Sequence, residues 1–154
     1  MDGDFTIHKS AKVTEKVLIA CYKALSDHCV ILEGSILKTN MSRSGSLSEN
    51  QAEMEEVAKA SIKVLQHSVP CAVPGVAFLS GGMTEEDASS ALNHINEISD
   101  KKPWNLTFSY GRALQQSCLD AWKGNDKNVT EAQHKFIERA QANSLATLGS
   151  YKKA

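Results

Sequence analysis

The chain has 154 residues, of which 42% are hydrophobic, and its 17 basic and 18 acidic residues leave a formal net charge of −1. This length suits one domain with a sizeable core. The even charge balance argues against a nucleic-acid partner, which would require clustered Lys and Arg to neutralise phosphates. No apolar run approaches the roughly 20 residues that cross a bilayer, and the acidic N-terminus does not resemble a secretory signal. These features favour a cytoplasmic chain that acts away from membranes.

The cysteines and histidines are scattered along the chain. None forms a C-x-x-C pair or lies near another at the spacing of metal ligands, so the sequence predicts neither a metal site nor a disulfide framework. We expect the thiols to pack in the core, as free cysteines often do in a reducing compartment. They are Cys21, Cys29, Cys71 and Cys118.

The first third of the chain contains a helical pattern followed by a strand pattern. Residues 14–27 place apolar side chains on one face at helical spacing. The run VILEGSILK (30–38) is apolar and β-branched and has the length of a strand. After a serine-rich stretch, Ser48 and Gln51 form a capping-box pattern that predicts a helix reaching about Gln66.

Two further strand–helix pairs follow. The segment GVAFLSGG (75–82) reads as a second strand, and Thr84 is expected to start the next helix, whose acidic first turn suits the helix dipole. The segment NLTFSYG (105–111) reads as a third strand, and Arg112 is expected to begin the helix after it. A helix therefore follows each predicted strand after a short turn.

The last segment has a second capping-box pattern at Thr130 and Gln133 and is predicted to be helical toward Ser150. One helix, three βα units and a terminal helix indicate an α/β fold with a parallel sheet covered by helices. Three strands are too few for a doubly wound sheet, and the glycine-rich nucleotide motifs of such folds are absent from the sequence. A (β/α)₈ barrel needs eight strands and about 250 residues. Three strands with their helices would match the closing part of such a barrel, which leaves open that the chain is only a piece of one.

Lys38 is the first candidate for chemistry, since it closes the first predicted strand. Strand alternation would place Leu32, Gly34, Ile36 and Lys38 on one face. At the C-terminal end of a barrel strand a lysine points into the mouth, where the active sites of this fold lie. Apolar surroundings would lower its pKa and leave an amine that can attack a carbonyl. The alternative is a surface lysine at the end of an edge strand.

The ends of the second and third predicted strands suggest a phosphate site. Ser80 and Gly81 follow the second strand, and Ser109, Gly111 and Arg112 lie at the end of the third. Glycines expose backbone N–H groups, serines add hydroxyl donors, and an arginine offers a charged fork suited to phosphate. The last strands of barrels often build a phosphate site in this way. The alternative is that both segments are only tight turns.

Three motifs together resemble the class I fructose-1,6-bisphosphate aldolases: EGSILKTNM (33–41), VPGVAFLSGGMTEEDA (73–88) and KPWNLTFSYGRALQQSCLDAW (102–122). The likeness covers nearly the whole chain. It implies a (β/α)₈ barrel, usually assembled as a homotetramer, that acts in glycolysis and gluconeogenesis with no metal or other cofactor. It also implies that residues 1–154 form a single partial barrel domain, roughly the C-terminal half of a subunit.

The resemblance assigns a role to each candidate. Lys38 matches the lysine that forms a Schiff base with the ketone carbon of the sugar phosphate. Ser80 and Gly81 match the loop that holds one substrate phosphate, and Ser109, Gly111 and Arg112 match the other side of that pocket. The implied activity is the reversible cleavage of fructose 1,6-bisphosphate to dihydroxyacetone phosphate and glyceraldehyde 3-phosphate.

Parts of the family pattern lie outside the chain or differ within it. The family carries a proton-transfer glutamate in an E-P-E-I-type segment before the point where this chain starts, and a C-terminal tail that this chain lacks. Glu33 lies five strand residues from Lys38, about 16 Å, too far to replace that glutamate. After Met41 the usual V-T-x-G-H loop is replaced by residues 42–45, SRSG. A catalytically incomplete half-barrel that binds phosphate or a protein partner is therefore the alternative function.

Overall fold

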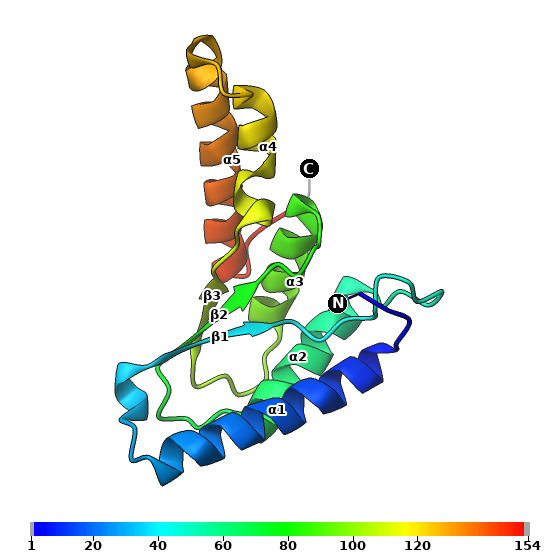
Figure 1. Cartoon of the computed structure of the whole chain (residues 1–154), viewed down its shortest axis with the longest axis vertical. Helices are drawn as coiled ribbons and strands as arrows, with labels where there is room; N and C mark the ends of the chain where they lie inside the picture. The colour runs from blue at the N-terminus through cyan, green and yellow to red at the C-terminus, as the bar shows by residue number, and fades with distance from the viewer. Residues whose placement is uncertain (1, 153–154) are drawn as a thin grey trace.

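The computed structural model describes residues 2–152 and contains one helix, three βα units and a terminal helix (Figure 1). This order confirms the predicted α/β class. The bounds are α1 (Ile7–Asp27), η1 (Leu32–Gly34), β1 (Ile36–Asn40), α2 (Met54–Ser68), β2 (Gly75–Leu79), α3 (Glu85–Glu97), β3 (Asn105–Phe108), α4 (Arg112–Trp122), η2 (Asp126–Asn128) and α5 (Val129–Thr147).

The three strands form one parallel sheet in the order β1-β2-β3. Lys38 of β1 is in register with Ala77 of β2, which is in register with Thr107 of β3. The carboxyl ends of all three strands therefore meet at one edge of the sheet. The loops predicted to carry the chemistry begin at this edge.

One face of the sheet is covered and holds the core. The side chains of Val76 and Phe78 are fully buried, and Thr39 and Leu106 on the flanking strands are nearly so. Their core partners include buried residues of α2 and α3, which are Val57, Ala58, Ile62, Leu65, Ala88, Ala91, Leu92 and Ile95. This burial accounts for the apolar residues at alternate positions of the strands.

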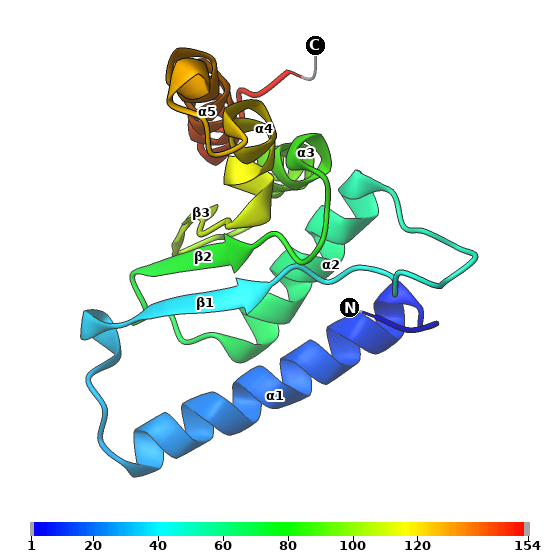
Figure 2. The same ribbon diagram turned by 45° about the horizontal axis from the view of Figure 1, so that its top comes forward.

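The other face of the sheet is open. Ile36 is 70% exposed, and Lys38 and Asn105 are exposed as well. Figure 2 shows α1 and α2 on one side of β1 and β2, with no ribbon across the opposite side of these two strands. Among residues 2–152, the helices thus cover only one of the two faces that a parallel sheet normally buries.

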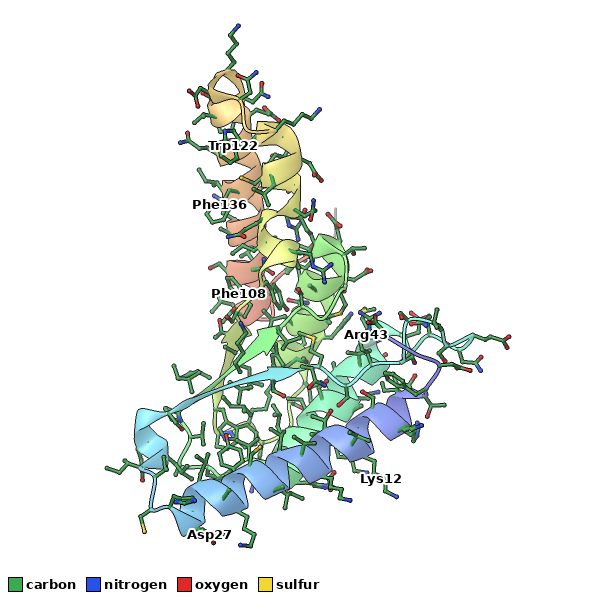
Figure 3. The ribbon with its side chains drawn as sticks, in the orientation of Figure 1. Lys12, Asp27, Arg43, Phe108, Trp122 and Phe136 are labelled. Carbon is green, nitrogen blue, oxygen red and sulfur yellow. The ribbon has the colours of Figure 1, made fainter. Side chains whose placement is uncertain are left out.

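Helices α4 and α5 form a hairpin that projects beyond the sheet (Figure 1). Polar contacts tie its base to α3: the Arg139 guanidinium donates to the Glu85 carbonyl at 2.8 Å and to the Ser89 hydroxyl at 2.7 Å. The Glu85 carboxylate accepts from the backbone N–H and the hydroxyl of Ser117. The outer part of the hairpin is exposed, and Trp122 and Phe136 lie there (Figure 3).

Helix α1 and the segment after it differ from the prediction. The helix begins seven residues earlier than expected, at Ile7, because the Thr6 side chain accepts a hydrogen bond from the Lys9 N–H. The predicted strand 30–38 is also wrong in its bounds. Residues 32–34 form η1, and β1 begins only at Ile36. The expected shared face therefore holds for Ile36 and Lys38 but not for Leu32 and Gly34.

Both predicted capping boxes are wrong, each for its own reason. The Gln51 amide donates to the carbonyls of Gly45 and Ser48, and α2 begins only at Met54. At the other end of the chain, η2 leads directly into α5. That helix begins at Val129, so the predicted cap at Thr130 lies inside it.

The cysteines also differ from the prediction of core packing. Cys21, Cys29 and Cys71 are exposed, and Cys118 is half-buried. In residues 2–152 no group of three or more His, Cys, Asp or Glu side chains is placed to hold a metal ion. Within the same residues, no helix has both the length and the hydropathy needed to cross a membrane.

Candidate active site

The loop after β2 brings Ser80 and Gly81 to the carboxyl edge of the sheet. Ser80 is buried, and its carbonyl accepts from the Met83 N–H at 3.1 Å, which closes a tight turn. Gly81 and Gly82 have φ angles of +62° and +78°. Residues with a Cβ atom rarely adopt positive φ angles. Two successive glycines therefore allow the backbone to turn here, and without side chains they leave its N–H groups uncovered. Thr84 then caps α3 as predicted, accepting from the Asp87 N–H.

The loop after β3 brings Ser109, Gly111 and Arg112 to the same edge. The Ser109 N–H donates to the Phe78 carbonyl at 2.8 Å, which extends the pairing of β3 with β2 beyond the last strand residue. Gly111 is the N-cap of α4, and Arg112 is its first residue, with an exposed side chain. The positive end of the helix and the guanidinium charge therefore meet at one place, as an anion site requires.

Tyr110 anchors this second loop from beneath. Its ring is buried, and its hydroxyl donates to the Ala88 carbonyl of α3 at 2.8 Å. Burial raises the pKa of the Tyr110 phenol, because the phenolate would lose its hydration. With Tyr110 held in the core, Ser109 and Gly111 on either side of it are fixed at the edge of the sheet. The sequence analysis did not single out this residue.

Lys38 lies in the middle of β1 and not at its end, because the strand continues to Asn40. It shares the open face with its register partner Ala77, which lies three residues before Ser80. Three strand residues span about 10 Å, and much of that distance can be covered by the four-carbon stem of a lysine. The sheet thus places an amine and two phosphate-type loops toward one edge.

The surroundings of Lys38 differ from the expectation of an apolar environment. Its side chain is exposed, since the face that carries it is open. Within residues 2–152 its amine forms no hydrogen bond or ion pair. Glu33, which the sequence analysis rejected as a proton-transfer group, is exposed in η1 and lies outside the sheet. The described residues therefore present the amine without a carboxylate partner.

A cleft of about 410 Å³ separates the first turns of α3 and α4. Arg112 lines it together with the carboxylates of Glu85, Glu86 and Asp120. The Glu85 carboxylate accepts a hydrogen bond from the Ser117 hydroxyl, and Glu86 forms an ion pair with Arg139 at 3.5 Å. These two carboxylates therefore connect α3 to α4 and α5, a role that is separate from the dipole effect predicted for the acidic first turn.

Comparisons with known proteins agree with the motifs. The family model described as "Fructose-bisphosphate aldolase class-I", of the glycolytic type, matches residues 1–154. Fructose-bisphosphate aldolase 4, cytosolic, of Arabidopsis thaliana is 59% identical over 152 residues, which cover 99% of this chain and 39% of that protein. Fructose-bisphosphate aldolase 1 of Caenorhabditis elegans is 52% identical over 151 residues, covering 97% of this chain and 41% of that protein.

The structural comparison gives the same result. The fructose-bisphosphate aldolase of Plasmodium falciparum, solved in complex with TRAP and a small-molecule inhibitor, superposes with a TM-score of 0.96 at 47% identity. The match covers 99% of this chain and 44% of that one. The chain thus spans about two fifths of the length of the relatives that it matches. By its sequence and by its fold, it belongs to the class I fructose-bisphosphate aldolase family.

Proposed function

We propose that this chain supplies the Schiff-base lysine and the phosphate pocket of a cytosolic class I fructose-bisphosphate aldolase. Lys38 is the nucleophile, and the phosphate is held by Ser80, Gly81, Ser109, Gly111 and Arg112. The observation that carries the proposal is that, in a chain of this family, the parallel register gathers both loops at the carboxyl edge of the sheet, with Lys38 on the open face two residues before the end of β1. The names of the plant relatives place those proteins in the cytosol, which supports the same location here.

The proposed reaction needs no metal or other cofactor. The neutral Lys38 amine adds to the ketone carbon of fructose 1,6-bisphosphate, and loss of water followed by uptake of a proton at the nitrogen gives a protonated imine. When the neighbouring carbon–carbon bond breaks, its electron pair moves toward the imine nitrogen, and a carboxylate supplied by the remaining strands takes the hydroxyl proton of the departing half as glyceraldehyde 3-phosphate leaves. Protonation of the remaining carbon and hydrolysis of the imine release dihydroxyacetone phosphate and restore the amine. The two loops fix the phosphate, which orients the ketone toward Lys38.

The three βα units are, in this proposal, the C-terminal part of a (β/α)₈ barrel, and residues 1–154 are one partial domain. The open sheet face supports this view, since it is the face that a barrel turns inward. The exposed apolar side chain of Ile36 on the first strand has the same explanation. The remaining strands would enclose Lys38 and supply its proton-transfer carboxylate. The intact enzyme would assemble as a homotetramer.

The second candidate function is that of a phosphate-binding or interaction module without turnover. It is favoured by one observation: within residues 2–152 the Lys38 amine has no carboxylate partner and stands exposed on an open face. Such a chain would keep both loops and bind phosphate, but no group within residues 2–152 would enclose the Lys38 amine or exchange protons with a substrate bound to it. The two candidates therefore differ in the reactivity of Lys38 and agree on the pocket.

Borohydride trapping tests the proposal. The 154-residue chain is incubated with dihydroxyacetone phosphate and borohydride, and the product is analysed by intact mass and peptide mapping. We expect one reduced adduct at Lys38, absent from Lys38→Met and retained in Lys127→Met, which removes an exposed lysine on η2. An adduct spread over many lysines, or none from a chain shown by circular dichroism to be folded, would contradict a reactive Lys38 in this chain and favour the second candidate.

A further inference from the structure

Arg43 lies in the loop after β1, close to the candidate phosphate site. Its half-buried side chain extends to the loop after β2, where the guanidinium Nη1 donates to the Gly81 carbonyl at 3.4 Å. Figure 3 shows Arg43 near the arrowheads of β1 and β2. Because β2 is the central strand, Arg43 and Arg112 approach its loop from opposite sides.

We propose that Arg43 is a second cation of the phosphate pocket, which binds the substrate phosphate opposite Arg112 and holds the Gly81 turn in place. This inference rests on the proposed function of the two loops. It adds a binding residue that neither the sequence motifs nor the resemblance assigned, because the family loop quoted above has threonine at this place.

The charge distribution around the loop supports this role. A cleft of about 400 Å³ lies between the start of α1 and the end of β1, and Arg43 and Lys9 line it with no acidic residue. On the other side of the loop, Arg112 shares its cleft with three carboxylates. At Arg112 alone, an anion would therefore be repelled by the neighbouring carboxylates. Arg43 adds a positive charge from the other side of the loop, where no carboxylate of residues 2–152 lines the cleft.

The guanidinium also has donors to spare. It carries five N–H groups, and the Gly81 carbonyl takes one of them. Within residues 2–152 no carboxylate forms an ion pair with Arg43, in contrast to Arg139, which pairs with Glu86. The remaining N–H groups can bind two phosphate oxygens at once, an arrangement that suits arginine better than lysine.

The test uses inorganic phosphate as the probe and the 154-residue chain as the protein, with the affinity measured by NMR titration of the backbone amides of residues 80–82. Arg43→Gln keeps an N–H donor for the Gly81 carbonyl but removes the charge, and we expect it to weaken binding about fivefold. Arg43→Lys keeps the charge and should lose less. Lys127→Gln, which removes an exposed charge on η2 at the far end of the hairpin, should bind as the native chain does.

The outcomes separate the inference from the proposed function. If Arg43→Gln binds phosphate as tightly as the native chain, then Arg43 only braces the turn, and the inference is wrong while the phosphate site stands. If Lys127→Gln weakens binding as much as Arg43→Gln, then the loss reflects the net charge of the chain and not a contact of Arg43, and the inference is again wrong. If the folded native chain binds no phosphate and its 80–82 amides do not shift, both the inference and the assignment of the two loops fail.

Discussion

The two faces of the sheet carry neighbouring residues of the same strands but have opposite environments. On the covered face, Phe78 is wholly buried beneath the helices, whereas Ile36 on the open face is 70% exposed. The covered face is a finished core that holds the fold together. The open face presents Lys38 without enclosing it. Under the proposed function, stability and chemistry belong to different faces of the same three strands, and each can be disturbed without the other.

The largest expected effect on stability comes from removing a buried side chain from the covered face. Phe78→Ala removes a fully buried ring from the central strand and should lower the free energy of unfolding by about 3–5 kcal/mol, as measured by urea denaturation. A loss of that size approaches the whole stability of a domain. A loss below about 1 kcal/mol would show that the core beneath the sheet is not packed as described.

Tyr110→Phe tests the anchor that joins the covered face to the loop after β3. Losing the hydrogen bond to the Ala88 carbonyl should cost about 1 kcal/mol at neutral pH. Because burial raises the pKa of the phenol in the folded chain, the unfolded chain releases that proton first, at a pH of about 10. The native chain should therefore lose stability as the pH rises above 10, and the variant should lose less. If the stability of the native chain and that of Tyr110→Phe fell equally with pH, the hydroxyl of Tyr110 would not be buried as described.

The smallest expected effect on stability is on the open face. Ile36→Ala should change the free energy of unfolding by less than about 0.5 kcal/mol, because its side chain is already exposed to water. It should, however, weaken any self-association of the chain, since an unpaired strand edge with apolar side chains invites pairing. Light scattering over a range of concentrations would measure this. A destabilisation comparable to that of Phe78→Ala would mean that the two faces do not differ.

The sequence predicted much of the fold, and each of its failures has a local cause. Helix order, the parallel sheet and the Thr84 cap follow from periodicity and local chemistry. The first capping box failed because the Gln51 amide closes a turn before α2, and the second because α5 already begins at Val129. The first strand was placed too early because Val30, Ile31 and Leu32 have the composition of a strand, but residues 30–35 form an irregular segment and a 3₁₀ turn.

Some residues of the candidate site could be predicted from the sequence, and others only from the structure. Lys38, Ser80, Gly81 and the residues after β3 could be named from motifs, because each motif is short and continuous. Tyr110 and Arg43 could not, since their roles depend on which segment they meet. Tyr110 reaches the Ala88 carbonyl, 22 residues away, and Arg43 reaches the Gly81 carbonyl, 38 residues away. Only the strand order makes these segments neighbours.

Periodicity, glycine-rich turns and apolar strands, which are properties of adjacent residues, determined the α/β class, and the motifs identified the family. The tertiary structure decided which face of each strand is covered, that Lys38 stands mid-strand and exposed, and that Arg43 lies beside Gly81. These features depend on how helices far apart in the chain pack against the sheet, because burial and long-range hydrogen bonds are set by segments that the local sequence does not specify.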